Sequence, residues 1–310
     1  MMPSELDTSN DVLIIRYGEL SLKTLYVRRR FESILVNNIK SILDANNIKN
    51  KIVREWGRIY VYTTDNSKAI RILRRLFGVT SVSHAVKTDS NLDSISLGAV
   101  DMMSKNLKKN QSFALRVTRV GEHSYTSQEA SRIIGDRIRK ALSASVNLSR
   151  PDVELFIEIR DKHAYLFFDK IRGPGGYPLG SQGCTVALID TARDLLAAWY
   201  MMRRGCSVVF VLINKELEDI LSSFVDTWCS YRRSRVYNIY NESDTLKIVK
   251  DIINKNKCLG VVTGHSLYYD SDISFLKRMK DVVECPILSP LIVFDKEDIK
   301  KGLSNIGVSI

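Results

Sequence analysis

The chain has 310 residues, of which 45% are hydrophobic and 26% are charged. This length exceeds what one small core needs and favours two or three globular domains. No apolar run approaches the roughly 20 residues of a membrane span, and residues 1–10 lack the basic and apolar regions of a secretory signal. The composition therefore excludes a transmembrane protein and favours a cytoplasmic one, with residues 1–10 as a disordered tail.

Positive charge is concentrated in the first part of the chain. Residues 1–178 contain 29 Lys and Arg against 19 Asp and Glu, a net charge of +10, whereas residues 179–310 contain 17 against 16. Clustered cations indicate a polyanionic partner, because they release the counterions condensed on phosphates. An anionic membrane surface and a merely solvated basic surface are the alternatives.

The segment 11–87 alternates strand-like and helix-like runs in the order βαββαβ. The expected elements are a strand Val12–Tyr17, a helix Thr24–Asn46, strands Lys51–Glu55 and Arg58–Thr63, a helix from Ser67 to Phe77 ending at Gly78, and a strand Val79–Lys87. This order predicts a ferredoxin-like domain.

The segment 88–172 predicts a second domain with another order. Its expected elements are a helix Leu92–Leu107, a strand Ser112–Val120, a helix Ser127–Leu142, and strands Val153–Ile159 and Ala164–Asp169. Thr126 and Glu129 have the spacing of a capping box at the start of the second helix.

Arginine and lysine side chains on these elements are the candidates for phosphate contacts. Three consecutive arginines on one helix point about 100° apart, so at least two of Arg28, Arg29 and Arg30 must face solvent. On the strand 112–120, Arg116 and Arg119 fall on opposite faces. The full set of expected RNA-binding residues is Lys23, Arg28, Arg29, Arg30, Arg58, Arg116, Arg119, Arg132, Arg137 and Lys140.

A Gly-rich stretch, 173–183, breaks the periodicity and predicts a linker before the last domain, 184–310. Beyond it, strand-like and helix-like runs alternate, which predicts a doubly wound parallel sheet. The runs are Cys184–Ile189, Arg193–Arg203, Val208–Ile213, Leu217–Phe224, Leu246–Asn254, Leu259–Val262, Ile273–Met279 and Lys296–Leu303.

Two strand ends of this last domain are candidates for a nucleotide site. The loop after the first strand contains Asp190 and Asp194 but no glycine, so it suits a polyphosphate poorly. The loop after Leu259–Val262 offers two hydroxyls and a glycine, with His265 as a candidate acid or base. The expected nucleotide-binding residues are Ile189, Asp190, Thr191, Arg193, Asp194, Thr263, Gly264 and Ser266.

The five cysteines have no metal-ligand spacing, which favours a reducing compartment and predicts no metal site. Buried small side chains are the ordinary role for each of them. Cys229, close to the basic segment 231–235, is the candidate for a reactive thiol, because neighbouring arginine would lower its pKa.

Motifs along nearly the whole chain resemble the tRNA 4-thiouridine synthetase family, also called tRNA sulfurtransferases, which belongs with thiamine biosynthesis proteins. The matching segments are Arg16–Lys23, Gly57–Arg58, Phe77–Val79, Phe113–Ile138, Pro151–Asp152, Gly173–Gly183, Ala197–Gly205, Val262–Gly264 and Pro290–Glu297. The resemblance implies a ferredoxin-like domain, a THUMP domain and a PP-loop domain.

The resemblance further implies that residues 1–172 bind tRNA, the THUMP part gripping the acceptor end. It implies a last domain that adenylates a uridine with ATP and Mg²⁺ before sulfur replaces the oxygen, with a sulfur-donor protein as partner if active. The family's Ser-Gly-Gly-x-Asp-Ser loop falls on residues 189–194, where both glycines are missing and Arg193 replaces the aspartate. Two hypotheses stay open: a tRNA-thiolation protein, and a tRNA-binding paralogue or scaffold without ATP chemistry. No catalytic residue is assigned, and a homodimer is a further candidate assembly.

Overall fold

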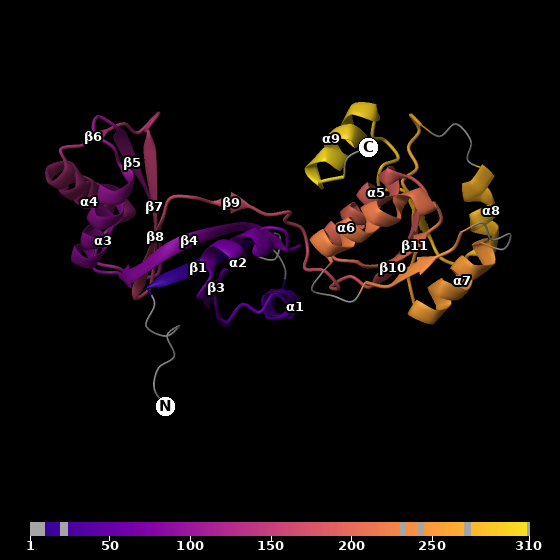
Figure 1. The fold of residues 1–310 in the computed structure, drawn as a ribbon. Coiled ribbons are helices and arrows are strands. Elements are labelled where there is room, and N and C mark those ends of the chain that lie inside the picture. The colour runs from indigo at the N-terminus through magenta and orange to yellow at the C-terminus, as the bar shows by residue number, and fades with distance from the viewer. Residues whose placement is uncertain (1–9, 19–23, 230–233, 241–244, 270–273, 309–310) are drawn as a thin grey trace. The chain divides into compact units, whose positions relative to one another are not determined.

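The structure is a computed structural model that describes residues 10–18, 24–229, 234–240, 245–269 and 274–308. These residues form two compact units. The first consists of residues 1–16, 48–71 and 81–172, and the second of residues 17–47, 72–80 and 173–310. Figure 1 shows the fold. No helix of the described residues is long and apolar enough to cross a membrane.

One mixed sheet runs through the first unit. Its strands follow the order β2-β3-β1-β4-β8-β7-β5-β6, and β9 pairs with β4 off this path. The strands are β1 (Asp11–Tyr17), β2 (Asn50–Glu55), β3 (Arg58–Thr63), β4 (Val79–Asp89), β5 (Ser112–Val120), β6 (Ser145–Val146), β7 (Val153–Arg160), β8 (His163–Phe167) and β9 (Ile171–Arg172). Because β4 pairs with β8, the ferredoxin-like and THUMP strands form a single surface.

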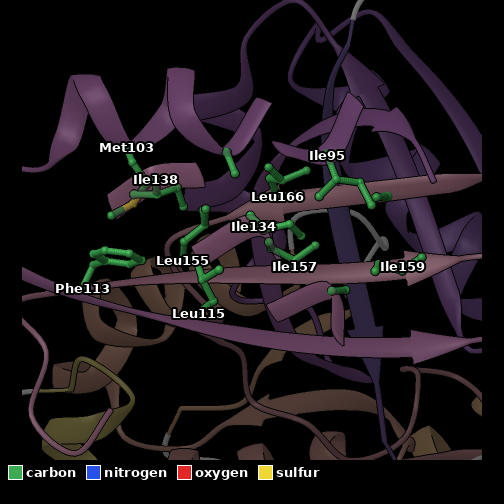
Figure 2. Packing of buried hydrophobic residues seen from close by; sticks show 13 residues of the cluster. Ile95, Met103, Phe113, Leu115, Ile134, Ile138, Leu155, Ile157, Ile159 and Leu166 are labelled. Carbon is green, nitrogen blue, oxygen red and sulfur yellow. The ribbon is translucent and has the colours of Figure 1, made fainter. Parts of the chain in front are cut away.

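Two helices cover one face of the THUMP strands, α3 (Leu92–Asn106) and α4 (Ser127–Leu142). Their apolar sides meet Phe113 and Leu115 of β5, Leu155 and Ile157 of β7, and neighbouring residues in one buried cluster (Figure 2). The expected capping box is present: the Thr126 hydroxyl and the Glu129 carboxylate bond each other's backbone N–H groups. This packing leaves the opposite sheet face uncovered by α3 and α4.

The second unit contains a parallel sheet in the order β12-β11-β10-β13-β14. Its strands are β10 (Cys184–Ile189), β11 (Ser207–Leu212), β12 (Val236–Asn238), β13 (Val261–Val262) and β14 (Ile287–Leu288). The helices are α5 (Ala192–Arg203), α6 (Glu218–Trp228), α7 (Thr245–Asn256), α8 (Ser274–Val282) and α9 (Lys296–Asn305), with a 3-10 turn at Lys215–Leu217. The strand order reverses between β10 and β13, so their carboxyl ends form the switch point where such sheets bind ligands.

Two further helices come from the ferredoxin-like part, α1 (Leu25–Ala45) and α2 (Asn66–Leu73). The helix α2 ends four residues before the expected Phe77, because Arg75 and Leu76 bond carbonyls three residues back and tighten the chain into turns. Gly78 does adopt the left-handed conformation, with φ +95°, and its N–H donates to the carbonyl of Gly175. The predicted ferredoxin-like, THUMP and parallel-sheet fold class is confirmed, although the short strands β6, β9, β12 and β14 gave no sequence signal.

Candidate functional site

A cavity of about 390 Å³ lies on the sheet face of the first unit opposite α3 and α4. Among the described residues that line it, five carry positive charge and Glu158 carries negative charge. The cations are Arg16, Arg58, Arg116, Arg160 and Lys170. We call this site the cationic cavity. Four of the five cations belong to strands of one sheet: Arg16 is the penultimate residue of β1, Arg58 begins β3, Arg116 lies within β5 and Arg160 ends β7.

Glu158 holds two of these arginines in place. Its carboxylate accepts hydrogen bonds from Arg58 Nε at 3.1 Å, from Arg58 Nη2 at 2.7 Å and from Arg16 Nε at 3.3 Å. Burial by itself would raise the pKa of Glu158, but the bond from Arg58 and the charges of both arginines keep that pKa below its ordinary value. Glu158 is therefore ionised and neutralises part of the cavity's positive charge.

The floor of the cationic cavity is aromatic. The rings of Phe156 and Phe167 stack at 5.4 Å with 7° between their planes. The guanidinium of Arg16 lies 4.7 Å from the centre of the Phe167 ring, and Lys170 Nζ lies 4.3 Å from that of Phe156. Burial and the nearby charge of Arg16 lower the pKa of Lys170. Cations held this close raise each other's energy, so an anion entering the cavity relieves that repulsion.

One side-chain nitrogen of Arg16 has no hydrogen-bond acceptor among the described residues. Its Nη1 donates to the hydroxyl of Ser83 at 2.8 Å, while its Nη2 is buried without a hydrogen-bond partner among the described residues. A buried guanidinium nitrogen without an acceptor is costly, because the bonds that it made to water are not replaced.

The predicted RNA-binding cations divide between two faces of the sheet. Arg58 and Arg116 line the cationic cavity. Arg132, Arg137 and Lys140 are exposed on α4, whose apolar side covers the other face. The α4 cations therefore lie on the other side of the sheet from Arg116.

The remaining predicted cations differ in exposure. Arg29 and Arg30 are exposed, as the helical spacing requires. Arg28 is 6% exposed, and its Nε bonds Glu32 at 2.8 Å, so it is an internal ion pair rather than a surface phosphate contact. Arg119 is half-buried on the face of β5 opposite Arg116, and its Nη1 donates to the carbonyl of Gly121 at 3.3 Å. Lys23 lies outside the described residues.

Three cavity cations were not among the predicted residues: Arg16, Arg160 and Lys170. Two of them had a readable signal, because Arg16 and Arg160 each sit at the end of an apolar strand-like run. A charged residue at such a position projects beyond the core or into an opening at the sheet face. That their strands share one face of one sheet could not be read from the sequence.

At the switch point of the second unit, backbone N–H groups of the loop after β10 donate hydrogen bonds to a carboxylate at the end of the same loop. Asp194 accepts hydrogen bonds from the backbone N–H groups of Asp190 at 3.1 Å, Thr191 at 2.8 Å and Gly264 at 2.5 Å, and from the Thr191 hydroxyl at 3.0 Å. Asp194 is 8% exposed, and burial raises its pKa while these bonds act in the opposite direction. The donors that a phosphate would use at a helix N-terminus are thus occupied by a side chain.

The other predicted residues of this site gather around the same loop. Gly264 lies so close to it that an added Cβ would stand 2.7 Å from the carbonyl carbon of Arg193. Thr263 and Ser266 are buried, with their hydroxyls bonded to Ser289 at 3.2 Å and to the Phe294 carbonyl at 2.7 Å.

Three further predicted or candidate residues lie in the same region. Ile189 is buried at the end of β10. The guanidinium of Arg193 lies 4.6 Å from the centre of the Tyr269 ring. His265 is half-buried in the loop after β13. Because Asp194, Thr263 and Ser266 are hydrogen-bonded within the protein, the region is a closed polar network rather than an open phosphate cradle.

Cys229 does not fit the role of a reactive thiol. It is 2% exposed at the end of α6, and burial raises the pKa of its thiol to about 12. The expectation that neighbouring arginine lowers this pKa is wrong, because loss of hydration outweighs any such charge.

Models of known protein families match three segments of the chain. Residues 12–83 match the ThiI ferredoxin-like domain, residues 89–169 the THUMP domain, and residues 235–309 the thiamine biosynthesis protein (ThiI) family. A probable tRNA sulfurtransferase of Methanosarcina mazei is 34% identical over 98% of this chain and 84% of its own length. One from Methanobrevibacter smithii is 32% identical over 96% of this chain and 86% of its own length. The chain belongs to the tRNA sulfurtransferase family.

Two solved structures have a similar fold. The crystal structure of PH1313 from Pyrococcus horikoshii matches with a TM-score of 0.84 and 29% identity, covering 96% of this chain and all of the other. A crystal structure of a 4-thiouridine synthetase–RNA complex with bound ATP matches with a TM-score of 0.82 over 96% of this chain and 85% of the other. At 22% identity the latter likeness shows the fold alone. The predicted family is confirmed.

Proposed function

We propose that this sulfurtransferase-family chain binds tRNA through the cationic cavity and acts in tRNA thiolation. The observation that supports it is the convergence of five cations in a THUMP-containing sheet. The named activity of the relatives, tRNA sulfurtransferase, supplies the substrate class. Backbone phosphates are the natural ligands, because structured RNA is recognised mostly through its phosphates and 2′-hydroxyls.

The size of the cavity favours binding of an unpaired end or loop of the RNA over binding of a flat duplex surface. A cavity of about 390 Å³ admits a phosphate with its sugar or one nucleotide, but not a helical stem. The exposed α4 cations on the other face are the competing interface. The charges on the two faces can be changed independently, because no residue belongs to both.

Salt dependence of tRNA binding tests which face is used. We expect Arg160→Gln with Lys170→Gln to weaken binding of a tRNA transcript and to reduce the slope of log K against log salt by about 1.4 to 1.8, the share of two phosphate contacts. The double variant Arg132→Gln with Lys140→Gln on α4 is the matched control. If only the α4 variant weakens binding, the proposed face is wrong; if neither does, the proposal of a phosphate-binding platform fails.

The nucleotide step is where this chain departs from its family. We propose that Asp194 fills the phosphate position of the loop, so that ATP does not bind there in the manner that the Ser-Gly-Gly-x-Asp-Ser loop implies. The four hydrogen bonds to its carboxylate support this, as does the charge repulsion that a polyphosphate would meet. A second candidate function, a tRNA-binding paralogue without ATP chemistry, rests on this observation.

Equilibrium dialysis with Mg-ATP separates the two candidates. Binding at micromolar affinity, or formation of an adenylated tRNA, would exclude the paralogue. Absence of binding up to millimolar ATP would exclude nucleotide-dependent thiolation by this chain and leave its tRNA binding unaffected.

A further inference from the structure

Two cysteines far apart in the sequence meet at the edge of the parallel sheet opposite to the switch point. Cys184 is the first residue of β10, and Cys258 stands between α7 and β13. Their sulfur atoms lie 2.6 Å apart, within about 0.6 Å of a disulfide bond length. Both cysteines are free thiols in this structure.

The backbone fixes this meeting. Val186 pairs with Val261 in the parallel register of β10 and β13, and the N–H of Leu259 donates to the carbonyl of Cys184 at 2.8 Å. On the other side, the N–H of Cys258 donates to the carbonyl of Ile253 and closes α7. The backbone of both cysteines is therefore held by hydrogen bonds to regular structure.

The two thiols are unlike each other. Cys184 is partly exposed, whereas Cys258 is 7% exposed. The hydrogen bond from Cys258 lowers the pKa of Cys184 against the effect of burial, and the charge of Arg235 acts in the same direction as that bond. The same contact, with burial, raises the pKa of Cys258. A partly exposed thiol of lowered pKa beside a buried thiol of raised pKa is the arrangement of an attacking and a resolving cysteine.

We propose that Cys184 and Cys258 form a reversible disulfide by exchange with a low-molecular-weight disulfide. The Cys184 thiolate attacks one sulfur of that disulfide, forms a mixed disulfide and releases one thiolate. Cys258 then loses its proton and attacks the Cys184 sulfur, which releases the second thiol and leaves the Cys184–Cys258 bond. The protein loses two hydrogens, and the small disulfide is reduced to two thiols.

This pair does not belong to the chemistry of the switch point. Cys184 begins β10 and the loop of Asp194 follows its other end, which for a strand of six residues is a separation of about 17 Å. The pair instead joins β10 to the segment before β13 across a loop of 74 residues. A bond closing a loop of this length restricts the unfolded chain and so stabilises the folded domain. The inference is independent of the proposed function.

Oxidised glutathione, applied to the full-length native protein, tests the proposal. We expect two of the five thiols to be lost, a mass lower by two hydrogens, and a non-reduced peptide map with Cys184 linked to Cys258. The oxidised protein should melt about 5–10 °C higher than the reduced one, and a mild thiol reductant should reverse the shift. The Cys206→Ser variant is the matched control and should form the same link.

The variant Cys258→Ser should stop at the mixed disulfide, with the mass of one glutathione added at Cys184. A wild-type protein that keeps glutathione on Cys184, that links Cys184 to Cys206 or Cys285, or that shows no linked peptide would overturn the proposal. Because the decisive map is made on the wild-type chain, the result does not depend on how well a variant folds.

Discussion

Replacing Glu158 by glutamine tests whether the cationic cavity is held together by this carboxylate. Glu158 is 7% exposed and accepts three hydrogen bonds from two arginines. Removing one partner of a buried ion pair leaves the other charges uncompensated and costs about 3–5 kcal/mol. Glutamine keeps one acceptor oxygen, so we expect about 3 kcal/mol, which corresponds to a fall in Tm on the order of 10 °C for the unit that contains β7.

Glu154→Gln is the matched control for this change. Glu154 bonds Arg116 at 2.6 Å, but both side chains are 37–38% exposed, so their pair contributes about 0–1 kcal/mol. Calorimetry of wild type and both variants gives the comparison. A Glu158→Gln variant that loses no more stability than Glu154→Gln would refute the reasoning.

Three further outcomes follow from the structure. The folded-state pKa of Glu158 is lowered, so its contribution to stability is present above the unfolded pKa of about 4.3 and is lost as the pH falls through the folded pKa. The difference in Tm between wild type and Glu158→Gln should therefore shrink in acid. Asp194→Ser should cost about 2–4 kcal/mol by leaving backbone N–H groups unsatisfied, and added phosphate should raise the Tm of this variant but not of wild type. Thr126→Ala should cost about 1 kcal/mol in thermal unfolding through loss of the α4 cap, whereas Ser127→Ala should cost much less.

Much of the fold was readable because its signals are local. The helix α4 and the strand β5 lie where their apolar periodicity and capping residues put them, since such patterns depend on neighbours a few residues apart. The parallel sheet of the second unit followed from continuous apolar strands alternating with helices. The strands β12 and β14, of three and two residues, were not predicted, because so short a run carries no periodicity and is defined only by its partner strand.

The functional sites were readable only in part. The sequence showed that the loop 189–194 lacks the glycines of its family, but not that Asp194 turns inward to bond the loop's own N–H groups. It also showed an excess of cations, without showing that Arg28 pairs internally with Glu32. Solvent exposure and ion pairing depend on residues brought together by folding, so composition cannot assign them.

By itself, the sequence determined the order of the elements, the family and the basic character of the first part of the chain. These properties reside in periodicity, motif and charge count, which survive in an unfolded chain. Tertiary structure alone decided which cations share a face, because Arg16, Arg58 and Arg160 come from three strands. It also brought Cys184 to Cys258 across 74 residues, since the pairing of β10 with β13 exists only once the sheet has formed.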